Sequence, residues 1–121
     1  MTNRSGFTFV ELLVSITIIA ILTSAAVVSY TNVSRNSRDS RRLLDIENIR
    51  SALELCRTES GSYPPSIYTP DNITCDSVVY LAITPKDPKT DSNYVYVRNS
   101  LTSYNLSCTL EGGGACSFTN P

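Results

Sequence analysis

The sequence predicts an α+β fold, in which a long N-terminal helix carries a small antiparallel β-sheet of three or four strands on its C-terminal half. A strongly apolar run near the N terminus continues into an amphipathic helical pattern. Towards the C terminus, apolar and polar residues alternate instead, which is typical of half-buried strands. With 121 residues, the chain is long enough for one small domain.

The apolar run begins at Phe7 and is long enough to cross a membrane. Residues 12–28 contain no charge, and extension back to Phe7 adds only Glu11. About 20 helical residues cross the hydrocarbon layer of a bilayer. A cleaved secretory signal is less favoured, because its apolar region is about 7–15 residues long and ends at a small-residue cleavage site. We therefore expect a membrane-spanning helix.

Glu11 is unusual for a plain signal anchor. A charge at the centre of a spanning helix costs about 2.5–3.5 kcal/mol, and less towards an interface. Because Glu11 lies near one end of the run, one interpretation is that its side chain reaches the interface. The other is that the carboxylate has a designated positive partner.

The residues around Glu11 resemble the processing site of type IV pilins and type II secretion pseudopilins. In that family a short hydrophilic leader ends in Gly, a Phe follows, and a Glu lies four residues further on. Residues 5–14 of this chain, SGFTFVELLV, match that pattern. The resemblance implies that a prepilin peptidase cuts after Gly6 and that Phe7 becomes the new, methylated amino terminus.

The resemblance also implies that Glu11 forms an inter-subunit salt bridge with the amine of Phe7. At about 4 Å and an effective dielectric near 20, such a pair attracts by roughly 4 kcal/mol before desolvation. An unpaired Glu11 would be buried without compensation. We expect this ion pair to determine which subunits associate and in which register their helices pack.

Three segments follow from this resemblance. We expect a leader at 1–6 that is removed, a transmembrane and filament-core helix at 7–30, and a globular pilin domain with the amphipathic helix half at 31–121. Many pilins carry a helix-disrupting Pro where this chain has Val28. We therefore expect only a weak break, around residues 23–26.

The helical pattern continues over residues 33–56. Its apolar stripe has spacings of three, four and three residues, formed by Ile46, Ile49, Leu53 and Cys56. The sequence SGSYPP at 60–65 predicts the end of the helix. Candidate strands of a β-meander follow at 78–83, 94–97 and 103–110, with a turn at 85–88.

The four cysteines predict two disulfides in an oxidising compartment, because the chain has no His and no C-x-x-C pair. Three connectivities remain open. We favour Cys56–Cys75, which would pin a loop to the helix stripe, and Cys108–Cys116, which would close a short glycine-containing loop.

An arginine cluster follows the apolar run, at Arg35, Arg38, Arg41 and Arg42. We favour a solvated or subunit-contacting helix face over nucleic acid, because Asp39 interrupts the cluster and no aromatic platform accompanies it. Basic residues near a span tend to stay cytoplasmic. This rule would place the C-terminal domain in the cytoplasm. The cysteines and the expected leader indicate instead that this domain lies outside the cytoplasm, and we favour that orientation.

Composition argues against an enzyme. Without His, the sequence cannot form a Ser-His-Asp or Cys-His arrangement or a His-ligated metal site. The charge is nearly balanced, with 10 basic and 11 acidic residues. We expect no cofactor. Asp87 and Asp91 are calcium candidates only by resemblance to pseudopilins with a calcium loop, and ordinary turn aspartates are the favoured interpretation.

The expected function is that of a subunit of a type IV pilus, an extracellular filament on a bacterial surface for adhesion, surface contact or twitching. The alternatives are a pseudopilin of a type II secretion system and a DNA-uptake filament. The implied partners are copies of the chain, the prepilin peptidase and, indirectly, an inner-membrane assembly platform and its ATPase. We expect a single-pass inner-membrane protein before assembly.

Overall fold

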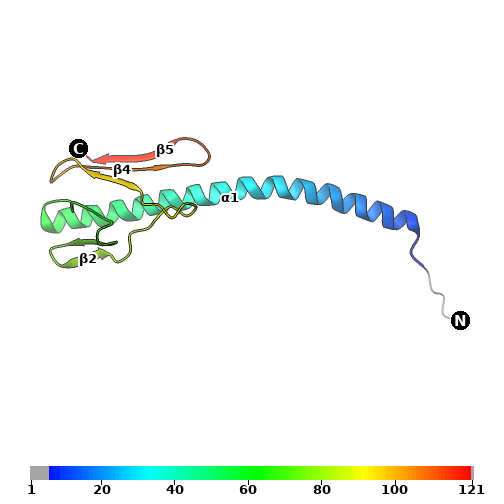
Figure 1. Cartoon of the computed structure of the whole chain (residues 1–121), viewed down its shortest axis with the longest axis horizontal. Coiled ribbons are helices and arrows are strands. Elements are labelled where there is room, and N and C mark those ends of the chain that lie inside the picture. Colours follow the sequence, from blue (N-terminus) through cyan, green and yellow to red (C-terminus); the bar gives the residue numbers. More distant parts are fainter. Residues whose placement is uncertain (1–5, 121) are drawn as a thin grey trace. The chain divides into compact units, whose positions relative to one another are not determined.

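A computed structural model describes residues 6–120 of the chain (Figure 1). One helix, α1, spans Phe9–Ser60, and five strands follow it. They are β1 (Ile73–Cys75), β2 (Val78–Leu81), β3 (Val95–Arg98), β4 (Tyr104–Thr109) and β5 (Ala115–Asn120). The α+β class, the long N-terminal helix and the antiparallel pairing are confirmed.

The helix α1 is continuous through residues 23–26, so the expectation of a weak break there was wrong. Thr23 donates its hydroxyl to the carbonyl of Ile19 at 2.7 Å, and Ser24 donates to that of Ile21 at 2.8 Å. Hydroxyls bonded in this way need no partner outside the helix, and no proline removes a helical N–H at this point.

The strands form two separate antiparallel sheets, β1-β2 and β3-β4-β5. The meander expected over residues 78–110 is therefore divided, because β2 pairs with β1 and not with β3. Asp76 and Ser77 link β1 to β2 and both have positive φ, at 48° and 70°. Two such residues make the tight hairpin turn that suits the twist of paired strands.

The central strand of the larger sheet is β4. Its buried residues alternate with the exposed Asn105 and Thr109, which confirms the period-two pattern expected at 103–110. The strand β5 was not predicted, and it pairs along its whole length with β4.

The core lies between the C-terminal half of α1 and the two sheets. In the view of Figure 1, β2 lies on one side of this half and β4 and β5 lie on the other. Ile46, Ile49 and Leu53 are fully buried, as their spacing predicts. The largest side chains that pack with them from the loops and strands are Tyr63, Ile67, Ile73, Tyr104 and Leu106.

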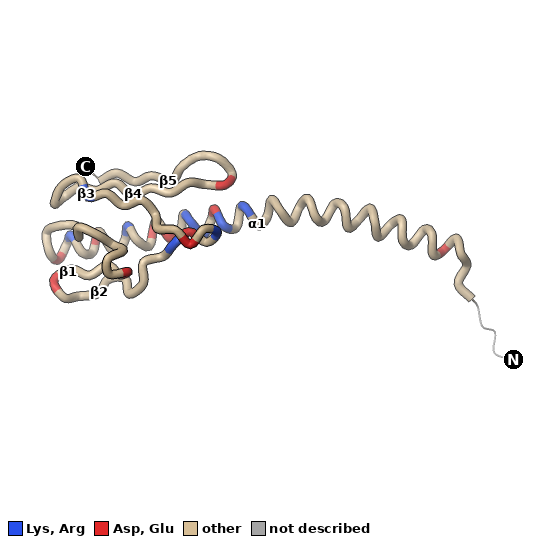
Figure 2. The backbone as a smooth tube through the Cα atoms, viewed as in Figure 1, with Lys and Arg blue, Asp and Glu red and all other residues tan. Residues whose placement is uncertain are grey.

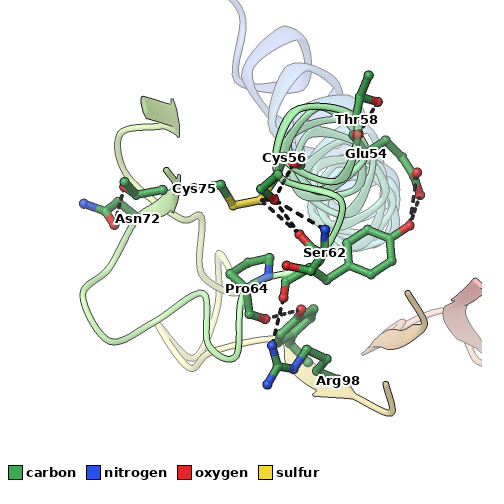
Figure 3. Close-up of a disulfide and its surroundings, with 12 residues drawn as sticks. Glu54, Cys56, Thr58, Ser62, Pro64, Asn72, Cys75 and Arg98 are labelled. Atoms are coloured by element: carbon green, nitrogen blue, oxygen red, sulfur yellow. Dashed lines mark hydrogen bonds between the residues drawn. A yellow bond between two sulfur atoms is a disulfide. The ribbon is translucent and has the colours of Figure 1, made fainter. Parts of the chain in front are cut away.

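Two disulfides cross-link the helix and strands around this core. One joins Cys56 on α1 to Cys75 on β1, with their Cα atoms 5.7 Å apart (Figure 3). The other joins Cys108 to Cys116, which face each other across β4 and β5. These are the pairings that the sequence analysis favours, and the described residues include no free cysteine.

Candidate functional site

The first turn of α1 is closed by a capping box. Thr8 precedes the helix, and its backbone N–H and its hydroxyl each donate to Oε2 of Glu11 at 2.8 Å. The N–H of Glu11 donates back to the Thr8 hydroxyl at 3.2 Å. This reciprocal pattern satisfies amides that a helix start leaves without partners. The T-x-x-E spacing of Thr8 and Glu11 is the sequence signal of this motif.

The capping box holds the Glu11 carboxylate at the positive end of the helix dipole. Both hydrogen bonds that the Glu11 carboxylate accepts in the capping box go to Oε2. Within residues 6–120, Oε1 of Glu11 accepts no hydrogen bond. The carboxylate is exposed, so this second oxygen remains available to a donor from another molecule.

Gly6 and Phe7 lie before α1 and are exposed. A Cβ added at Gly6 would meet nothing within 4 Å, and Gly6 is not among the glycines with positive φ. Nothing in the folded chain therefore requires a glycine here. Phe7 is 78% exposed. The other leader residues expected at 1–6, namely 1–5, lie outside the described residues.

The chain divides between Ser34 and Arg35 into two units, and the described part of the first is apolar and uncovered. All residues from 6 to 33 are exposed. The helix α1 has the length and composition needed to cross a membrane, and none of its most apolar window is buried. An apolar surface of this extent is typical of a membrane segment or an interaction surface.

In the second unit, α1 carries an exposed uncharged stripe, with the exposed charges of Arg41, Glu47 and Glu59 beside it. Its exposed residues recur at helical spacing: Ser37, Ser40, Leu44, Asn48, Ser51, Leu55 and Thr58. We call this set the outer stripe. Leu44 is 67% exposed and Leu55 is 56% exposed. A helix on the surface of a monomer normally carries its charges on this face.

Three charged residues of α1, Arg38, Asp39 and Arg42, contact the rest of the unit. Figure 2 shows charges gathered along this part of the helix, whereas the sequence between Phe9 and Ser34 has a single charged residue, Glu11. Arg42 is just 3% exposed. Its Nε and Nη2 donate to the two oxygens of Asp87 at 2.6 and 3.1 Å. Its Nη1 donates to Asp39 at 2.6 Å and to Glu111 at 3.2 Å.

Glu111 extends this ion network. Arg38 donates to its two oxygens at 2.6 and 2.9 Å, and Lys89 donates to Oε2 at 2.9 Å. Asp39 accepts the backbone N–H groups of Glu111 and Gly112 at 2.9 and 2.8 Å. The network thus binds the loop before β3 and the turn between β4 and β5 to α1.

The network also changes the interpretation of the arginine cluster. Arg38 and Arg42 are bound to carboxylates of their own chain, 69 or 73 residues away at Glu111 and 45 residues away at Asp87. Among the described residues, Arg35 and Arg41 form no ion pair. Sequence reasoning missed this arrangement because partners so far apart leave no local pattern.

Asp87 is a poor calcium ligand in this arrangement. Its Oδ1 accepts the backbone N–H groups of Lys89 and Thr90, besides one Arg42 bond, and its Oδ2 accepts the other. A cation would have to displace the guanidinium. Asp91 is exposed and donates its N–H to the Asp87 carbonyl. Residues 6–120 contain no group of three or more His, Cys, Asp or Glu that could hold a metal ion.

Acid is expected to destabilise the second unit. The guanidinium of Arg42 holds the pKa of the Asp87 carboxyl far below its ordinary value, and that of Arg38 does so for Glu111. A depressed folded-state pKa contributes stability above the unfolded-state value of about 4 and loses it as pH falls further. Urea unfolding of the detergent-solubilised chain should show a lower midpoint at about pH 2.5 than at about pH 6. Equal midpoints would contradict this role.

Parts of the chain are similar to known proteins. Residues 1–27 match the family model described as "Prokaryotic N-terminal methylation motif". The chain is similar to Prepilin peptidase-dependent protein D of Escherichia coli (strain K12), with 39% identity over 61 residues. The alignment covers 50% of this chain and 42% of that protein, so the chain spans less than half of that relative. No solved structure gives a significant match.

Proposed function

We propose that the chain is a type IV pilin-like protein that polymerises into an extracellular type IV pilus. Its N-terminal methylation motif and its similarity to the Escherichia coli relative support this proposal. It is a structural subunit, not an enzyme, and needs no cofactor. The filament serves adhesion, surface contact or twitching on a bacterial surface.

The observation that carries this proposal is the uncovered apolar helix. Every residue from 6 to 33 is exposed, and no other described residue of the first unit covers the large apolar side chains among them. Removal of apolar surface from water contributes about 25 cal/mol of stabilising free energy per Å². This surface is therefore expected to be covered by lipid or by other copies of the helix. Lipid covers it before assembly, and the helices of neighbouring subunits cover it afterwards.

The outer stripe supports the same proposal. Its seven positions form an uncharged strip on the part of α1 that belongs to the second unit. Small residues such as Ser40 and Ser51 permit helices to approach closely. Packing of helices in the filament would therefore bury both the apolar run and this stripe.

Processing follows the pilin pattern. The leader at 1–6 is removed by a prepilin peptidase, a dependence that the name of the Escherichia coli relative describes for that protein. The new amine on Phe7 is methylated and pairs with Glu11 of a neighbour. Residues 7–30 form the filament core and residues 31–121 the outer domain. An inner-membrane platform and its ATPase act on the subunit during assembly.

A pilus is favoured over the two alternatives by the ion network. A pseudopilin with a calcium loop would need free carboxylates, and Asp87 is bound by Arg42. A DNA-uptake filament would use the arginine cluster, and Arg38 and Arg42 are bound to acids.

Filaments sheared from cells that express the chain test the function. We expect electron microscopy to show thin fibres, and mass spectrometry to find a chain that begins at a methylated Phe7. Gly6→Leu should keep its leader and yield no fibres. Sheared fibres that lack this chain, or that contain it with the leader intact, would refute the proposal.

A further inference from the structure

Two of the exposed charges beside the outer stripe have no ion-pair partner in the described part of their own chain. Glu47 is paired locally, because its Oε2 lies 3.3 Å from Nη1 of Arg50. Arg41 and Glu59 are exposed, and neither belongs to an ion pair within residues 6–120. These two unpaired charges are opposite in sign.

Arg41 and Glu59 lie on one line along the helix. They are 18 residues apart in a continuous α1, which is five turns at about 3.6 residues per turn. Their side chains therefore leave the helix in the same direction, about 27 Å apart. Arg35, which also has no ion pair among the described residues, is about six and two-thirds turns before Glu59 and points in another direction.

The position of Glu59 is unfavourable within its own chain. It lies in the last turn of α1, where the negative end of the helix dipole disfavours a carboxylate. The basic residue of that turn, Arg57, donates to the hydroxyl of Tyr63 at 3.3 Å. Burial, and then the carboxylates of Glu59 and Asp76, raise the pKa of Tyr80, so the surroundings of Glu59 include a second acid. A cation from another molecule would relieve this arrangement.

We propose that Arg41 of one copy forms an ion pair with Glu59 of a neighbouring copy in the filament. This inference rests on the proposed function and adds a contact that sets the axial offset between two copies. Parallel helices packed without an offset would place Arg41 beside Arg41 and Glu59 beside Glu59, and like charges repel. An offset of five turns, about 27 Å, brings the opposite charges together instead.

Charge complementarity favours a second copy as the partner. Each copy carries both charges, so a contact between Arg41 and Glu59 is head-to-tail and repeats along a helical assembly without closing. An exposed ion pair contributes little to association between free proteins. A neighbour already held by packing along the outer stripe has lost its translational freedom, so a modest pair is sufficient to select the offset.

A carbodiimide, which couples a carboxylate to an amine without a spacer, tests the contact in sheared filaments. Arg41→Lys keeps the positive charge and supplies the amine. We expect mass spectrometry to find an amide link between position 41 and Glu59, and a denaturing gel to show dimers and larger multimers. The two positions of one copy are about 27 Å apart, so this link can join only two copies. Arg41→Lys combined with Glu59→Gln is the matched control and should lack the link.

Reversal of the charges provides a second measurement. Arg41→Glu and Glu59→Lys should each lower the yield of sheared filaments about threefold to tenfold, because like charges then meet at an exposed contact. The double variant should recover most of the yield, because the two charges are opposite again. Thr119→Glu, at an exposed β5 position away from α1, is the control for added charge and should assemble normally.

The results that would overturn the contact leave the filament itself intact. They are links from position 41 only to residues other than Glu59, normal yields from both single reversals, or no recovery in the double variant. If the wild-type chain formed no filaments, the proposed function would be refuted, and this contact with it.

Discussion

Glu11→Ala is expected to leave the chain in the membrane, processed after Gly6, and to abolish filaments. In the proposed assembly the Phe7 amine of one subunit meets Glu11 of another, an attraction of roughly 4 kcal/mol at an effective dielectric near 20. Without Glu11 that amine would enter the apolar filament core unpaired. Electron microscopy of sheared material and mass spectrometry of the membrane-bound chain measure the two results. Normal filaments from Glu11→Ala would contradict this role.

The capping box complicates this experiment, because Glu11→Ala also removes a helix cap. Loss of a cap destabilises a helix start by about 0.5–2 kcal/mol. Glu11→Gln separates the two effects, since Gln occupies the same capping position but carries no charge. We expect Glu11→Gln to abolish filaments as well. Thr8→Ala, which removes the hydroxyl of the cap and keeps the Glu11 charge, should retain them.

The capping box and the inter-subunit pair are compatible in their geometry. Thr8 uses Oε2 of Glu11 for both of its hydrogen bonds, and Oε1 has no donor within residues 6–120. A neighbouring amine therefore has an oxygen to approach without opening the first turn. The cap fixes the side chain before assembly, so less conformational freedom remains to be lost when the pair forms.

Local patterns predicted much of this fold. The apolar run, the stripe through Ile46 and Leu53, and the alternation in β4 each repeat within a few residues, so they could be read from the sequence. The pairing Cys108–Cys116 joins register partners of one hairpin, so it too is a local feature. Such elements depend mainly on neighbouring residues.

The remaining features depend on contacts that are distant in the sequence. The strand β1 has only three residues, too few to show a period, and its pairing depends on the turn at Asp76 and Ser77. The outer stripe could be recognised only once the sheets had shown which helix face they cover. The ion pairs that join α1 to the two loops connect residues 45–73 positions apart. No spacing rule connects Arg42 with Asp87.

Arg42→Met is expected to destabilise the second unit by about 3–5 kcal/mol, the usual effect of removing one partner of a buried ion pair. Methionine keeps a long apolar side chain at the position but leaves Asp87 without its guanidinium and removes bonds to Asp39 and Glu111. Small domains are stable by only about 5–15 kcal/mol, so the loss is a large share. Urea unfolding of the detergent-solubilised chain measures it.

Arg41→Met is the matched control for Arg42. The two arginines are adjacent, but Arg41 is exposed and forms no ion pair among the described residues, so its replacement should change stability by no more than about 0.5 kcal/mol. Asp87→Leu combined with Arg42→Met should recover part of the loss, because neither charge of that pair then remains buried alone. Equal effects of Arg41→Met and Arg42→Met would show that the network adds no stability. A difference between them would show that charges turned inward hold the two loops on α1, which leaves its outer stripe uncharged for contact with other helices.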